Sequence, residues 1–138
     1  MRNIQKEWTL SRNETSILNK VVLILRDNDM LLFAKRSNAE KHLKGWIPLP
    51  AGGHIEVEET AEEAIIREAR EELGIVVKIT RFLGQVKHKD QLLVFEGKPL
   101  SGDFILDRRE IEEIKWIPIN QAKIFSINIL TDKILALL

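Results

Sequence analysis

Apolar and polar residues alternate in short blocks along the first third of the chain. The runs KVVLILR (Lys20–Arg26) and MLLFAK (Met30–Lys35) are rich in β-branched and other apolar residues, which favours β-strands. The turn-forming residues Asp27, Asn28 and Asp29 separate the two runs. We therefore expect two strands joined as a hairpin.

The segment after this hairpin is polar at first and then rich in proline and glycine. The stretch from Ser37 to Gly45 is polar and basic, which is typical of a loop. Trp46 to Pro50 is expected to be extended, because each proline restricts the residue before it. The sequence Ala51-Gly52-Gly53 is then expected to turn the chain.

A helix is predicted from Ala61 to Leu73. Thr60 and Glu63 have the spacing of a capping box, in which each side chain accepts a backbone N–H at the helix start. Gly74 is a typical helix stop. At about 100° per residue, the apolar stripe of this helix comprises Ile65, Ala69 and Leu73.

The second half of the chain is expected to add strands and short helices. Strands are predicted at Ile75–Leu83, Gln91–Glu96 and Ile114–Ile119, with His88, Lys89 and Asp90 between the first two, and a helix after Asn120. Thr131 and Asp132 are expected to cap a last helix. The apolar residues at its end must pack on the domain or on a partner; they are Ile134, Leu135, Leu137 and Leu138. This order favours one α/β domain over residues 1–138, a sandwich with a mixed sheet.

The composition narrows the classes of function. The chain has 138 residues, and its 21 lysines and arginines balance its 21 aspartates and glutamates. No overall field therefore attracts nucleic acid or an anionic membrane, and we expect neither as a stable partner. The absence of cysteine excludes disulfides and thiolate chemistry. The N-terminal sequence MRNIQKEWTLSRNETS lacks the apolar core of a signal peptide, so a cytoplasmic location is expected.

Negative charge is concentrated in the predicted helix and the segment before it. Glu68, Glu71 and Glu72 share a helix face, because residues three and four apart are neighbours. Like charges at this spacing cost roughly 0.2–0.5 kcal/mol per pair, and partial burial raises that cost. Oxygen ligands of this kind suit a hard cation such as Mg²⁺ or Mn²⁺. Gly52 and Gly53 would let the backbone approach closely, so a carbonyl there is a candidate ligand as well.

A solvated helix rich in glutamate and arginine is the alternative for any run of glutamates. The spacing of the whole segment argues against it. The segment resembles the signature of the Nudix hydrolase family, G-x5-E-x7-R-E-U-x-E-E-x-G-U, where U is aliphatic. The fixed positions fall on Gly53, Glu59, Arg67, Glu68, Glu71, Glu72 and Gly74, and the aliphatic ones on Ala69 and Ile75.

This resemblance implies a Nudix-type α/β/α sandwich that hydrolyses a diphosphate linkage in a small nucleotide substrate with Mg²⁺. It implies that the Gly53 carbonyl, Glu68, Glu71 and Glu72 are metal ligands. Arg67 would hold a glutamate, either Glu59 or one of the metal cluster, through a bidentate contact. The general base stays open between Glu68, Glu72 and a glutamate outside the motif, and Glu110 is a candidate supplementary ligand.

Further residues and other functions are weaker candidates. Lys35 and Arg36, at the end of the second strand, are expected to contact phosphates together with four further lysines, and a solvated basic rim is the alternative; the four are Lys41, Lys44, Lys87 and Lys89. His42, His54 and His88 show no ligand spacing and are expected to be loop or surface residues. Two alternative functions are less consistent with the sequence. A non-catalytic nucleotide sensor would have lost motif glutamates, and all of them are present here. An isoprenoid-diphosphate isomerase of this fold would require an active-site cysteine, and the chain has none. We expect a monomer or a homodimer.

Overall fold

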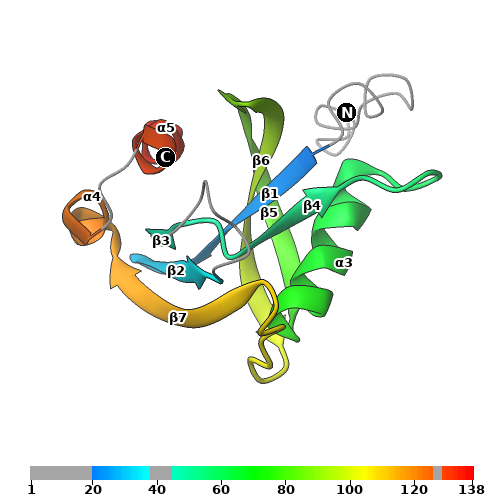
Figure 1. Ribbon diagram of the computed structural model, residues 1–138, viewed down its shortest axis with the longest axis horizontal. Helices are drawn as coiled ribbons and strands as arrows, with labels where there is room; N and C mark the ends of the chain where they lie inside the picture. The colour runs from blue at the N-terminus through cyan, green and yellow to red at the C-terminus, as the bar shows by residue number, and fades with distance from the viewer. Residues whose placement is uncertain (1–19, 38–44, 126–128) are drawn as a thin grey trace, which may run out of the picture.

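Seven strands form a mixed β-sheet in this computed structural model, which describes residues 20–37, 45–125 and 129–138 (Figure 1). The strand order is β3-β2-β1-β6-β5, with β4 also pairing with β1 and β7 with β2. β1 (Lys20–Asp27) runs parallel to β6 (Asp90–Ser101), and the other pairs are antiparallel. The predicted mixed sheet is confirmed.

The remaining elements follow the expected order. The other strands are β2 (Met30–Arg36), β3 (Trp46–Ile47), β4 (Ala51–His54), β5 (Val76–His88) and β7 (Ile111–Pro118). The helices are α3 (Ala61–Leu73), a 3₁₀ turn η2 (Ile119–Gln121), α4 (Ala122–Phe125) and α5 (Ile129–Leu135). In the described part of the chain, no helix is long and apolar enough to cross a membrane.

Helices cover both faces of the sheet, as Figure 1 shows: α3 lies on one side, and α4 and α5 lie on the other. The central strand β1 is buried on both faces because its side chains alternate. Leu23 and Leu25 belong to the core under α3, whereas Val22 and Ile24 belong to the core under the C-terminal helices. This arrangement is the predicted α/β/α sandwich.

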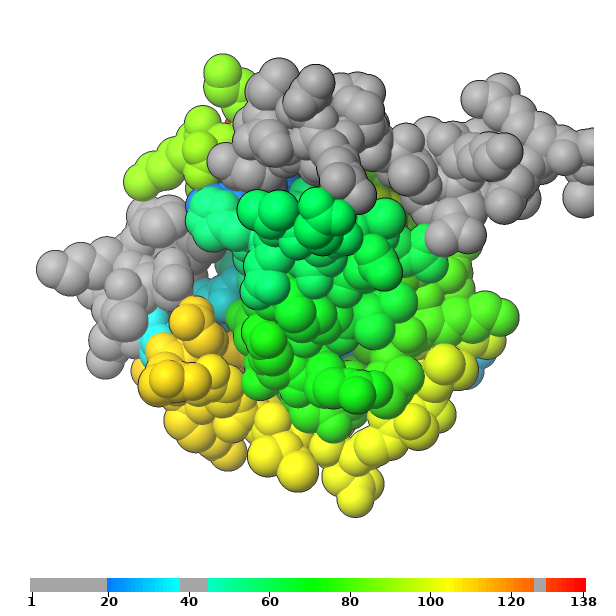
Figure 2. All heavy atoms as spheres, turned by 90° about the vertical axis from the view of Figure 1, so that its right-hand side faces the viewer, coloured from blue at the N-terminus to red at the C-terminus, as the bar shows by residue number. Residues whose placement is uncertain are grey.

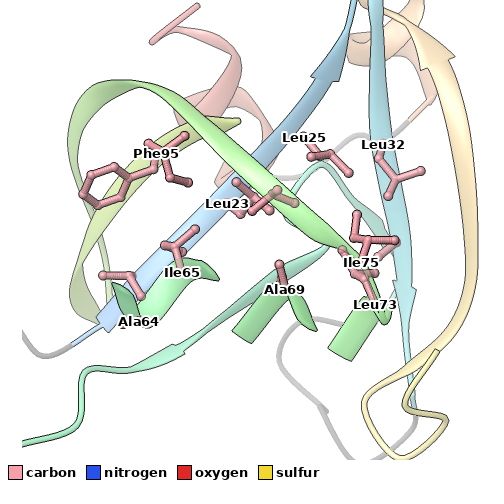
Figure 3. Close-up of a cluster of buried hydrophobic side chains, with 14 of the residues drawn as sticks. Leu23, Leu25, Leu32, Ala64, Ile65, Ala69, Leu73, Ile75 and Phe95 are labelled. Carbon is pink, nitrogen blue, oxygen red and sulfur yellow. The ribbon is translucent and has the colours of Figure 1, made fainter. Parts of the chain in front are cut away.

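The core under α3 is formed by small and branched side chains (Figure 3). Ile65, Ala69 and Leu73 are fully buried there, as their helical stripe predicts. They pack in one cluster with Leu23 and Phe95 from the central strands. Because Ala69 has only a methyl group, the helix axis can lie close to the sheet at that point.

The ends of α3 are those that the sequence predicts. The Thr60 hydroxyl accepts a hydrogen bond from the backbone N–H of Glu63, and the Glu63 carboxylate accepts one from the backbone N–H of Thr60. Gly74 ends the helix with φ of 73°, a left-handed conformation that favours glycine. Both caps depend only on local sequence, and this explains why the predicted bounds match.

Three predicted features of the fold are wrong or incomplete. The stretch Ala51–Gly53 does not turn the chain but belongs to β4, where Gly52 pairs with Val22 and Gly53 with Val21 of β1. β5 and β6 are longer than expected, so that Lys89 alone separates them. Thr131 does not cap the last helix but lies inside α5, where it is buried.

The C-terminal apolar residues pack on the domain itself. Ile134 is buried, and Leu135, Leu137 and Leu138 contact the core under the C-terminal helices. The predicted loop at residues 38–44, which includes His42, and the N-terminal segment lie outside the described residues.

The chain that follows β6 is tied to the end of α3. The Ile105 N–H donates to the carbonyl of Leu73, and the Asp107 N–H donates to the carbonyl of Glu72, each at 2.9 Å. These bonds satisfy two carbonyls that a helix end leaves without partners. In Figure 2 this yellow segment lies along the lower edge of the green helix.

Replacing Thr60 by alanine should lower the free energy of unfolding by about 1 kcal/mol, because the N-cap hydrogen bond is lost. Urea denaturation followed by circular dichroism measures the change. Thr60→Ser, which keeps the hydroxyl, should stay close to the parent protein. Equal losses in both variants would show that the cap hydrogen bond is not the source of the effect.

Candidate active site

A cleft of about 650 Å³ opens between α3, β4 and the ends of several strands. Ligand sites commonly have volumes of about 300–1,000 Å³. Arg67, Glu68, Glu71 and Glu72 of α3 line one wall. The other walls come from distant parts of the chain: β1, β2, the β5–β6 hairpin tip, the segment after β6, and Leu130 of α5.

The glutamates of α3 lie directly against the backbone of β4. The backbone N–H of Gly52 donates to Glu72 Oε2 at 2.9 Å. A Cβ atom on Gly53 would lie 2.6 Å from Glu68 Oε1, closer than van der Waals contact allows. Glycine at position 53 therefore lets the Glu68 carboxylate lie against the main chain.

Arg67 is the centre of a network of carboxylates. Its Nε and Nη2 atoms donate to the two oxygens of Glu59 at 2.7 and 3.0 Å, the bidentate contact that the sequence predicts. Its Nη1 atom donates to Glu68 at 2.8 Å and to Glu71 at 3.2 Å. Nη2 also donates to the His54 carbonyl at 3.0 Å, which ties the end of β4 to the helix. Hydrogen bonds from Arg67 hold the pKa of Glu59 below its ordinary value.

Glu72 is the most deeply buried carboxylate of the motif, with 6% of its side chain exposed. Burial raises the pKa of Glu72 to about 8, and the adjacent Glu68 carboxyl adds to the rise. The Gly52 N–H and Arg36 act in the opposite direction. Arg36 Nη1 lies 3.5 Å from Glu72 Oε1, which is long for a hydrogen bond, so desolvation prevails.

The donor set of this cluster fits a hard divalent cation. Glu68 and Glu72 are adjacent, shielded carboxylates that offer only oxygen, and Glu71 lies one turn from Glu68 with 56% of its side chain exposed. Glu68 and Glu71 contact Arg67, whereas Glu72 faces Gly52, so the described acids and histidines do not form a closed ligand set. A cation would compete with Arg67 for two of these carboxylates.

Lys35 and Arg36 were both predicted to contact phosphates, but only Arg36 lines the described cleft. Arg36 lines the cleft with 9% of its side chain exposed, and its buried Nε has no hydrogen-bond partner in the described structure. Lys35 does not line the described cleft, and its amino group lies 3.6 Å from Glu112. Neighbouring residues of a strand point to opposite faces. In addition, the pairing of β2 with β7 shifts register between Lys35 and Arg36.

Glu110 also lines the cleft, brought there by a short ordered turn. Its N–H donates to the Asp107 carbonyl at 2.9 Å, and its own carbonyl accepts from the Ser37 N–H at 3.0 Å. The Ser37 hydroxyl donates to the Arg109 carbonyl. These bonds join the turn to the end of β2, next to Arg36.

Sequence reasoning missed several residues of the cleft. His54 and His88 were expected at loop or surface positions, but both line the cleft. Lys20 lines it as well, whereas Lys89, which also lines it, was among the lysines expected to contact phosphates. Lys20 pairs with His54 across β1 and β4, and the β5–β6 hairpin ends beside them. No local pattern indicated this pairing, because the contacts join residues far apart in sequence.

A complete glutamate motif on a helix over a mixed sheet defines the Nudix class of protein. The NUDIX domain family model matches residues 18–138, and the chain belongs to this family. The solved MutT NUDIX hydrolase from Burkholderia pseudomallei has a similar fold, with a TM-score of 0.70 and 22% identity over 86% of this chain and 95% of that chain.

Two curated relatives match part of the chain. A NAD-capped RNA hydrolase NudC from Mannheimia succiniciproducens is 35% identical over 99 residues, which are 70% of this chain and 37% of the relative. An ADP-ribose pyrophosphatase from Methanocaldococcus jannaschii is 39% identical over 85 residues, 62% of this chain and 47% of the relative. The chain thus matches less than half of the length of either relative.

Replacing Glu59 by glutamine should lower the free energy of unfolding at pH 7 by about 1–2 kcal/mol, because Arg67 loses a charged acceptor. The pKa of Glu59 is lowered from 4.5 on folding, so its contribution is complete above that value and is lost as the pH falls through the folded-state pKa. Urea denaturation at pH 7 and pH 4 should therefore show a smaller difference between the two proteins at pH 4. An unchanged difference would contradict this account of the pair.

Proposed function

We propose that the protein hydrolyses a diphosphate linkage in a derivative of a nucleoside diphosphate, with Mg²⁺ or Mn²⁺, and releases a nucleoside monophosphate. The observation that carries the proposal is the position of Glu72. A shielded carboxylate, adjacent to Glu68 and facing a cleft, is stable as an anion only with a compensating positive charge.

The Gly53 carbonyl, Glu68, Glu71 and Glu72 would hold the cation, and Glu110, which lines the same cleft, would be a further ligand. A bound divalent cation neutralises phosphate charge and lowers the pKa of a bound water. Hydrogen bonds orient the three carboxylate ligands. The Gly52 N–H orients Glu72, and Arg67 orients Glu68 and Glu71.

Arg67 and Arg36 have different roles in the proposed site: Arg67 positions the carboxylates, and Arg36 binds the substrate. Arg67 is itself held by Glu59, so it keeps its place when Glu68 and Glu71 turn toward a cation. Arg36 lines the cleft with a largely buried guanidinium, and a phosphate oxygen suits that group. The proton of the attacking water would pass to Glu68, to Glu72 or to Glu110, which the structure brings to the same cleft.

The names of the relatives suggest where to look for the substrate. ADP-ribose and NAD both contain a diphosphate bridge, and these compounds occur in the names of the two matched hydrolases. The cleft, at about 650 Å³, has the size of a small-molecule site. We propose a small nucleotide as the substrate, free in the cytoplasm.

A panel of nucleotides tests the reaction. With Mg²⁺, the protein should release a nucleoside monophosphate from at least one of ADP-ribose, NAD, a nucleotide sugar, a nucleoside triphosphate and a dinucleoside polyphosphate. Glu72→Gln should fold but lose kcat by at least 100-fold, since the amide is a poor ligand for a hard cation. Chromatography of the products measures both. Full activity of Glu72→Gln would rule out this site, and nucleotide binding without any turnover would favour a sensor.

Adding 10 mM Mg²⁺ should raise the midpoint of thermal unfolding by a few degrees. A cation present at about 100 times its Kd stabilises the folded state by about 2.7 kcal/mol, and 10 mM reaches that ratio for a Kd of about 0.1 mM. EDTA should reverse the rise. Glu68→Gln should lose most of it, whereas Glu62→Gln, which removes a charge from the first turn of the same helix, should retain it. An equal rise in both variants would place the cation elsewhere.

A further inference from the structure

The β5–β6 hairpin brings a lysine, Lys89, to the cleft. His88 pairs with Asp90, so Lys89 is the single residue between the two strands, and all three residues line the cleft. Lys89 has a φ of 65°, in the left-handed region. Glycine and asparagine enter that region readily, whereas lysine does so at a cost. The same conformation in the β1–β2 turn is taken by an asparagine, Asn28.

The other lysines and arginines of the described cleft each have a carboxylate partner. Arg67 contacts Glu59, Glu68 and Glu71, as described above. The remaining pairs are Lys20 with Asp90 at 3.0 Å, Arg36 with Glu72 at 3.5 Å, and Arg109 with Asp107 at 3.0 Å. Within the described part of the chain, Lys89 is the one cleft-lining lysine or arginine without an ion pair or hydrogen bond.

The hairpin tip is held in place from two sides. The Lys20–Asp90 ion pair joins it to the start of β1. On the other side, the Lys133 amino group of α5 donates to the Lys87 carbonyl at 2.6 Å. The position of Lys89 at the cleft is therefore built by contacts that do not involve its own side chain.

A polyanionic substrate needs a positively charged side chain such as Lys89 in this cleft. Seven described carboxylates line the cleft against five lysines and arginines, so an entering diphosphate meets a net negative wall. Lys89 lies on the side of the cleft formed by Lys20 and by His54, the residue after Gly53. A phosphate held near Gly53 would thus have an uncommitted ammonium group on that side.

We propose that Lys89 is a substrate-binding residue that contacts a phosphate group of the nucleotide and sets KM rather than kcat. This inference rests on the proposed hydrolysis at the same cleft. The hairpin tip brings Lys89 to the cleft, and the other described lysines and arginines there already have carboxylate partners.

The test is steady-state kinetics on the best substrate of the nucleotide panel. Lys89→Asn removes the charge but suits the left-handed backbone, so it should fold at least as stably as the parent and raise KM roughly tenfold, with kcat within twofold. Lys89→Arg should restore KM to within twofold of the parent value. Lys87→Gln removes the same charge two residues away, outside the cleft lining, and should leave KM unchanged.

Two results would overturn the inference: a KM for Lys89→Asn within twofold of the parent, or an equal rise in Lys87→Gln. If the parent protein turns over no nucleotide, the proposed function fails, and titration calorimetry with ADP-ribose and Mg²⁺ tests Lys89 separately. Weaker binding by Lys89→Asn than by Lys87→Gln would then support it. Equal binding by the two variants would overturn it.

Discussion

The site depends on how closely α3 approaches the backbone of β4. The Glu72 carboxylate accepts the Gly52 N–H, and the Glu68 carboxyl occupies the space that a side chain at position 53 would need. This approach is helped by Ala64 and Ala69, two small buried side chains of the helix, which let it lie close to the strands (Figure 3). Gly53 and the small aliphatic position Ala69 therefore serve one requirement: carboxylates placed against main-chain atoms.

The close approach of α3 to β4 also places several carboxylates in a partly buried site, which is electrostatically unfavourable. The positive charge that compensates for them is unequally distributed. Arg67 distributes one positive charge over Glu59, Glu68 and Glu71, and all three remain partly accessible to water. Glu72 receives only a backbone N–H and a distant guanidinium, and burial raises its pKa to about 8. The cluster is thus balanced on the Arg67 side and short of positive charge on the Glu72 side. A divalent cation at the cleft would correct that imbalance.

Local patterns predicted α3 to the residue, because its capping box and its final glycine are determined within a few positions. The family resemblance predicted a bidentate contact of Arg67 with Glu59 or with a glutamate of the metal cluster, and the partner in the structure is Glu59. The role of β4 was missed because two glycines favour a turn, and only pairing with β1 makes them a strand. The separation of Lys35 from Arg36 depends on a register shift against β7. Neither pairing leaves a local signal in the sequence.

The cleft likewise combines a part determined by local sequence with parts determined by long-range contacts. The carboxylate wall comes from one continuous segment, whereas the opposite walls come from the hairpin tip, the turn around Glu110 and Leu130 of α5. Each of these has its own attachment: Asp90 to Lys20, Ser37 to Arg109, and Lys133 to Lys87. Because these three attachments do not involve the side chains of Glu68, Glu71 or Glu72, changes at the hairpin tip and changes at the carboxylates should be close to independent in the free energy of unfolding. The residues that select a substrate can therefore vary while the geometry of the carboxylate cluster is preserved.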